Sequence, residues 1–126
     1  DAAMTKQGVE ALGTDGVELA ILENVGNLVC PAEFDTGAVK NVMILSVPEG
    51  DDKPLKYPLM FKVSDVVLIN KIDVLPYFDF DVEKCKEYIK HRNPNAKIFL
   101  ICAKTGEGIE EWATWLNDEV REWIDK

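Results

Sequence analysis

The stretch that decides the fold spans residues 65–73 and reads DVVLINKID. Its apolar part is short and mostly β-branched, which is typical of a strand buried on both faces of a parallel sheet. An amide, an ammonium and a carboxylate follow, on Asn70, Lys71 and Asp73. Ligands of parallel sheets bind just beyond the carboxyl ends of the strands, so we expect these three side chains to line a ligand site.

The three polar side chains suit the edge of a guanine base. Guanine presents neighbouring N1–H and N2–H donors, and a single ionised carboxylate such as that of Asp73 can accept both. The amide of Asn70 can bond guanine N7 or brace neighbouring loops. The methylene stem of Lys71 can lie along the base with its charged end in water. The alternative interpretation is a strand followed by an ordinary polar turn.

A second motif favours guanine. Residues 97–102 read KIFLIC and lead directly into AKTGEG at residues 103–108, before a predicted helix. This stretch looks like the Ser-Ala-Lys loop of GTPases, with Cys102 where serine is usual. The resemblance implies that the backbone N–H of Ala103 donates to guanine O6, with Lys104 beside it. The two motifs together predict a guanine pocket that rejects adenine.

Length and charge limit the possible functions. The 126 residues fit a single domain. The formal net charge of −9 argues against nucleic acid or anionic lipid as a partner, since both require clustered Lys and Arg. The sequence shows no signal peptide and no apolar run long enough to span a membrane. Its three cysteines lack regular spacing, which fits a reducing compartment, so a cytoplasmic protein is expected.

The sequence lacks the loop Gly-x-x-x-x-Gly-Lys-Ser/Thr that cradles nucleotide phosphates. A guanine pocket without that loop would lose most of the charge-assisted contacts to a nucleotide. We therefore interpret residues 1–126 as one partial domain, the C-terminal portion of a G domain. Its N-terminal strand and phosphate loop are expected upstream.

Strands are expected at about 18–23, 41–47, 65–70 and 97–102. Helices are expected at 2–12, 81–91 and 108–124, with a short one after Asp51 or Asp52 and before Pro58. This alternation predicts a three-layer α/β fold, in which helices cover both faces of a mainly parallel sheet.

A further polar stretch follows the first expected strand. Glu23, at the carboxyl end of that strand, is a candidate to hold Mg²⁺ directly or through water. Gly26 would let the backbone approach a terminal phosphate. The alternative is an acidic residue in a polar turn.

Three motifs carry a family resemblance: ENVGNLVCP at residues 23–31, EGDDKPLKYP at 49–58 and NKID at 70–73. They resemble the HypB family, GTPases that help to load nickel into nickel–iron hydrogenases, and the resemblance extends from about Asp1 to Trp115. It implies a P-loop GTPase fold of the SIMIBI type. Urease nickel chaperones share the guanine motif but lack Asn-Leu-x-Cys-Pro, so HypB is favoured.

The resemblance also implies a metal site. Cys30 matches a cysteine that, in this family, joins a Cys-His pair to bind nickel or zinc between two G domains, although the pair itself is absent here. Two Cys30 thiolates and two histidines across a dimer would give a four-coordinate site. A small buried hydrophobe is the alternative role for Cys30, and core packing is expected for Cys85 and Cys102.

The function that the resemblance implies is that of a Mg²⁺-dependent GTPase. It would bind GTP or GDP, form a GTP-dependent homodimer, and deliver nickel to a hydrogenase large subunit or another maturation factor. No residue is an obvious water-activating base, so the catalytic residues stay unassigned, and this chain alone is expected to be inactive. The alternatives are a non-catalytic fragment that binds guanine and metal, or a related chaperone GTPase for urease or a cobalamin enzyme.

Overall fold

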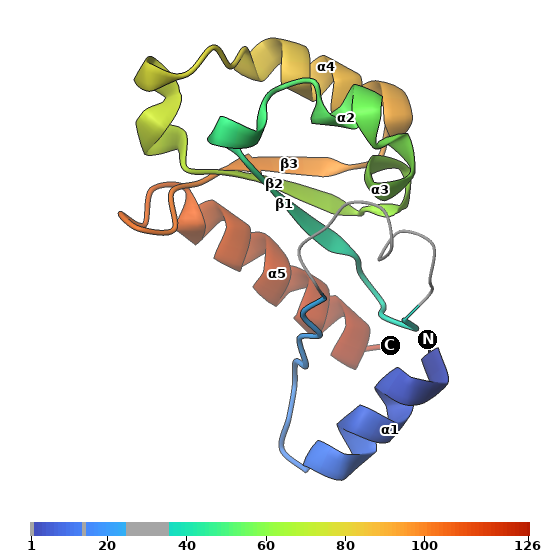
Figure 1. The fold of residues 1–126 in the computed structure, drawn as a ribbon. Helices are drawn as coiled ribbons and strands as arrows, with labels where there is room; N and C mark the ends of the chain where they lie inside the picture. Colours follow the sequence, from blue (N-terminus) through green and yellow to red (C-terminus); the bar gives the residue numbers. More distant parts are fainter. Residues whose placement is uncertain (1, 14, 25–35) are drawn as a thin grey trace.

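The computed structural model describes residues 2–13, 15–24 and 36–126 (Figure 1). A parallel sheet in the order β1-β2-β3 forms its centre. The strands are β1 (Val42–Ser46), β2 (Val66–Asn70) and β3 (Lys97–Leu100). The helical elements are α1 (Ala2–Leu12), η2 (Val47–Glu49), α2 (Lys53–Lys56), α3 (Pro58–Val63), η3 (Ile72–Tyr77), α4 (Val82–Arg92) and α5 (Ile109–Ile124).

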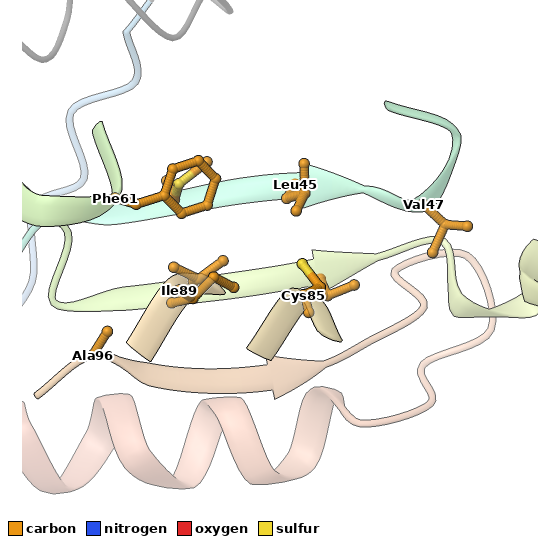
Figure 2. Close-up of a cluster of buried hydrophobic side chains, with 9 residues drawn as sticks. Leu45, Val47, Phe61, Cys85, Ile89 and Ala96 are labelled. Atoms are coloured by element: carbon orange, nitrogen blue, oxygen red, sulfur yellow. The ribbon is translucent and has the colours of Figure 1, made fainter. Parts of the chain in front are cut away.

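Helices cover both faces of the sheet, which confirms the predicted three-layer α/β fold (Figure 1). On one face, α3 and α4 enclose a core with β1 and β2, and Figure 2 shows Leu45, Cys85 and Ile89 gathered in it. On the other face, α5 packs against a second cluster, to which β2 contributes Val66 and Leu68. The central strand, β2, is thus buried from two sides.

Strand β2 accounts for the importance of residues 65–73. Its apolar side chains alternate between the two core clusters, and none is more than 4% exposed. Burying a side chain of this kind stabilises the fold by roughly 1.5–3 kcal/mol. A run that is apolar at every position can satisfy both faces, whereas an alternating run would leave one face polar.

The first strand of the sheet is buried on one face only. Met43 and Leu45 of β1 are buried, whereas Val42 and Ile44, on the α5 side, stay 42% and 56% exposed. Among the described strands, β1 pairs only with β2, so its other side forms one edge of the sheet.

The expected strand at 18–23 is wrong. Described residues 15–24 contain no helix or strand, and Leu19, Ile21 and Leu22 are 44%, 80% and 50% exposed. A strand exists only through hydrogen bonds to a neighbouring strand, and no described strand pairs with this segment. Its apolar residues alone could not provide that neighbour.

The predicted helices are confirmed with small changes at their ends. Helix α2 begins after Asp52 and ends before Pro58, which opens α3. The Asp52 side chain makes no capping bond and instead pairs with Lys56, at 3.2 Å. Asp51 accepts a hydrogen bond from the backbone N–H of Asp81, at 2.7 Å, and so ties this loop to the start of α4.

Trp112 and Trp115 of α5 are partly buried and pack against the second core cluster. Trp112 lies edge-on to Phe99, with ring centroids 5.9 Å apart, and stacks with Trp115 at 5.8 Å. Trp123, near the end of the helix, is 56% exposed. Among the helices of residues 2–13, 15–24 and 36–126, none has both the length and the apolar character that a membrane crossing requires.

Cys85 and Cys102 lie in the core, as predicted, and we expect Cys85 to be protected chemically. Burial raises the pKa of the Cys85 thiol from 9.0 to about 12, and the charge of Asp51 adds to the rise. The thiolate is the reactive form, so Cys85 should resist iodoacetamide at pH 8 in the native protein and react in urea. Peptide mass mapping checks this, and equal labelling in both conditions would contradict it.

The raised pKa of Cys85 also predicts that the stability of the fold depends on pH. The unfolded thiol loses its proton near pH 9, whereas the folded thiol keeps its proton until about pH 12. The contribution of Cys85 to stability is therefore fully present below pH 9 and is lost as the pH rises towards 12. Urea unfolding measured across this range should show falling stability, with a smaller fall in Cys85→Ala.

Candidate nucleotide site

The loops after β2 and β3 meet at the carboxyl edge of the sheet. The backbone N–H of Ile101 donates to the carbonyl of Ile69 at 2.8 Å, and the N–H of Ile72 donates back to the carbonyl of Ile101 at 3.3 Å. Beyond them, the backbone N–H of Ala103 donates to Oδ1 of Asn70 at 3.1 Å. Asn70 therefore braces the second loop, which is one of the two roles predicted for it.

The backbone turns sharply at Lys71, and Asp73 follows this turn. Lys71 has φ 63° and ψ 39°, and it is the one non-glycine residue with positive φ in the described part of the chain. That conformation costs a residue with a Cβ about 1–2 kcal/mol, and such strain often occurs at functional sites. Asp73 then lies exposed in the first turn of η3, beside the same edge.

Hydrogen bonds within the second loop hold Ala103 and Lys104 exposed at its tip. The N–H of Cys102 donates to the carbonyl of Glu107 at 2.8 Å, and the N–H of Gly106 donates to the carbonyl of Cys102, also at 2.8 Å. These two bonds close the loop at its base. Ala103 and Lys104 are exposed to solvent between them.

Gly108 completes the loop where α5 begins. Its φ is 76°, and a Cβ at this position would overlap the carbonyl oxygen of Leu100. Only glycine allows the start of α5 to approach β3 so closely. The sequence signal was the Gly-x-Gly pair ahead of the helix, but the close approach depends on tertiary packing.

Of the remaining candidate residues, Glu23 is the one that the structure describes. Glu23 lies in an exposed segment outside any helix or strand, so its expected place at the carboxyl end of a core strand is wrong. Gly26 and Cys30 lie outside the described residues. Within the ranges that the structure describes, no group of three or more His, Cys, Asp or Glu side chains is arranged to hold a metal ion.

We expect Asn70→Ala to loosen the contact between the two loops. The change removes the acceptor of the Ala103 N–H, at a cost of about 1 kcal/mol in stability. Hydrogen exchange of the Ala103 amide should become faster. Asn70→Asp, which keeps an acceptor oxygen, is the matched control, and equal loss of protection in both variants would contradict the bracing role.

The fold is a parallel α/β domain in which two loops are joined at the carboxyl edge of the sheet, where such domains bind their ligands. The family described as "CobW/HypB/UreG, nucleotide-binding domain" matches residues 2–100, and the chain belongs to this family. It is 53% identical over 117 residues to the hydrogenase maturation factor HypB of Azotobacter chroococcum mcd 1, which covers 92% of this chain and 38% of that protein. Its identity to HypB of Escherichia coli K12 is 49% over 119 residues, covering 94% and 41%.

Solved structures give the same similarity. HypB from Helicobacter pylori in complex with nickel superposes with a TM-score of 0.88 at 42% identity, covering 96% of this chain and 58% of that one. HypB from Archaeoglobus fulgidus gives 0.72 at 47% identity, covering 75% and 51%. The predicted resemblance is thereby confirmed. The chain spans 38% and 41% of the two curated relatives named above.

Proposed function

We propose that this chain is the guanine-binding portion of a GTP-hydrolysing metallochaperone that couples its nucleotide state to nickel delivery during hydrogenase maturation. The contact between Asn70 and Ala103 carries the proposal, because it unites two loops whose side chains suit guanine. Similarity to hydrogenase maturation factors supports the biological role. The nickel complex of the Helicobacter pylori relative supports nickel as the cargo, with zinc as the other candidate metal.

Each residue of the pocket has a proposed role. Asp73 accepts the N1–H and N2–H of guanine, the Ala103 N–H donates to O6, and the stems of Lys71 and Lys104 lie along the base. The Ala103 N–H already donates to Asn70, so guanine O6 has to share or replace that bond. Binding of the base therefore changes the hydrogen bond by which the Asn70 side chain holds the loop, and the position of the loop changes with it.

The phosphates are proposed to extend from this pocket along the carboxyl ends of the strands, past β1. A base held by the loops after β2 and β3 leaves that direction open, because β1 is the next strand and forms an edge of the sheet among the described strands. A phosphate loop from another strand would complete the site there. Glu23 and Gly26 remain proposed for Mg²⁺ and the terminal phosphate.

The metal site is proposed to form between two copies when GTP is bound. Cys30 would supply one thiolate from each copy, and a Cys-His pair from outside this sequence would complete the ligand set. The assembled homodimer would hand nickel to a hydrogenase large subunit or another maturation factor. Hydrolysis would then loosen the dimer and release the metal.

One observation favours a second candidate, a non-catalytic fragment that binds guanine and metal. No Gly-x-x-x-x-Gly-Lys-Ser/Thr loop occurs in residues 1–126. Without phosphate contacts, affinity should come mainly from the base and should therefore be weak. Nucleotide affinity of the 126-residue chain separates the two candidates.

The decisive experiment compares GDP, ADP and xanthosine diphosphate as competitors of fluorescent GDP. A longer protein that contains this chain should bind GDP and reject ADP, and should hydrolyse GTP. The 126-residue chain should bind GDP more weakly and without turnover. Equal affinity of the longer protein for GDP and ADP would overturn the guanine assignment.

A further inference from the structure

The outer side of β3 offers unpaired backbone groups. The N–H groups of Lys97 and Ile101 donate towards β2, to Asp65 and Ile69, at 2.9 and 2.8 Å. Along a strand, the backbone N–H and C=O groups of successive residues point alternately to its two neighbours. Those of Ile98 therefore point away from β2. No strand of the described part of the chain pairs with β3 on this side. The edge can therefore accept an added strand.

A shallow groove of about 610 Å³ runs along this edge, between β3 and α5. Its apolar lining consists of Ile98, Phe99 and Trp115. The rings of Phe99 and Trp115 lie 6.2 Å apart, centroid to centroid. Aromatic rings offer a large contact area to the side chains of an incoming strand.

Carboxylates surround the aromatic lining. Glu110, Glu111 and Asp118 of α5 line the groove, against the single ammonium of Lys97. None of the three carboxylates takes part in a salt bridge with another residue in the described ranges. The groove therefore has an apolar strip at its centre and more negative than positive side chains around it.

The opposite side of the same edge has a different charge balance. A second groove, of about 460 Å³, lies between α4 and β3. Its two acidic residues, Glu83 and Glu87, face three lysines, and Glu83 is already paired with Lys86 at 3.7 Å. Acidic residues therefore outnumber lysines only in the groove on the α5 side.

We propose that the groove between β3 and α5 binds an extended, basic peptide segment of a partner protein. The segment adds to β3 as a further strand through the backbone of Ile98, with lysine or arginine side chains over Glu111 and Asp118. Aliphatic stems of such side chains fit against Trp115, and their charged ends meet the carboxylates. Ala103 and Lys104 lie beyond the carboxyl end of β3 and are not among the residues that line this groove.

A synthetic hexapeptide of alternating lysine and valine, capped at both ends, is the probe. Calorimetric titration at low ionic strength should give a Kd below about 1 mM. The hexapeptide in which glutamate replaces lysine should not bind. An N-methylated version keeps the charge but lacks alternate backbone donors, so it should bind at least about tenfold more weakly if strand pairing operates.

Charge reversal locates the binding surface. The double variant Glu111→Lys and Asp118→Lys should weaken binding of the lysine–valine peptide by about tenfold or more. The matched control, Glu122→Lys with Asp125→Lys, makes the same change in net charge outside the groove and should have little effect. All four side chains are exposed, so the fold should tolerate both pairs.

Three results would overturn the proposal. Absence of binding by the lysine–valine peptide would exclude a basic segment as occupant. Equal binding of the N-methylated peptide would exclude strand addition. Equal weakening by the two double variants would show that net charge, and not this groove, attracts the peptide.

Discussion

Asp73→Asn is expected to reverse the base preference of a longer protein that contains this chain and a phosphate loop. Affinity for GDP should fall by on the order of 100-fold or more, because two charge-assisted hydrogen bonds of about 1.5–3 kcal/mol each are lost. Affinity for xanthosine diphosphate should rise, because the new amide N–H can donate to the additional carbonyl oxygen of xanthine. Competition against fluorescent GDP measures both changes.

Asp79→Asn is the matched control for this experiment. Asp79 is also exposed and follows the same element, η3, so the variant makes the same change in charge six residues further along the chain. Its preference for GDP over xanthosine diphosphate should be unchanged. If Asp73→Asn also left the preference unchanged, the assignment of Asp73 to the guanine edge would be wrong.

Gly108→Ala should be among the most destabilising single changes in this chain, at about 3 kcal/mol or more. The new Cβ would overlap the carbonyl oxygen of Leu100 and would lie only 3.2 Å from Cα of Ile101. Both neighbours are backbone atoms of the β3 region, so neither can move without disturbing the sheet or the start of α5. Urea unfolding monitored by tryptophan fluorescence measures the loss.

Gly106→Ala separates this overlap from the cost of the backbone conformation. Gly106 has a similar φ, 86°, but a Cβ there would meet no atom within 4 Å. The change should cost only about 1–2 kcal/mol, the penalty of a left-handed conformation. Equal destabilisation by the two variants would refute the steric explanation for Gly108.

The sequence predicted those elements whose own residues contain the decisive information. Strand β2 is apolar at every position and ends in polar residues, and the structure places it centrally between two helical layers. Residues 18–23 have a similar apolar pattern but depend on a neighbouring strand that the described chain does not provide. Local pattern indicates which segments are able to form strands, whereas pairing decides which of them do.

The candidate site was predictable in its residues but not in its connections. The polar side chains after β2 and the Ala-Lys loop were visible as motifs. The left-handed conformation of Lys71 was not, because non-glycine residues rarely adopt it. The bond from Ala103 to Asn70 joins residues that are distant in sequence, so it depends on the strand pairing that brings the two loops together.

The two edges of the sheet differ in how well they resist unwanted association. Carboxylates flank the β3 edge on the α5 side, so strands without positive charge are discouraged from pairing there. The β1 strand contains no charged residue and exposes Val42 and Ile44. During production of this chain at high concentration, β1 is therefore where aggregation is expected to start. Ile44→Lys is the simplest change to improve solubility, because that side chain is already half in water.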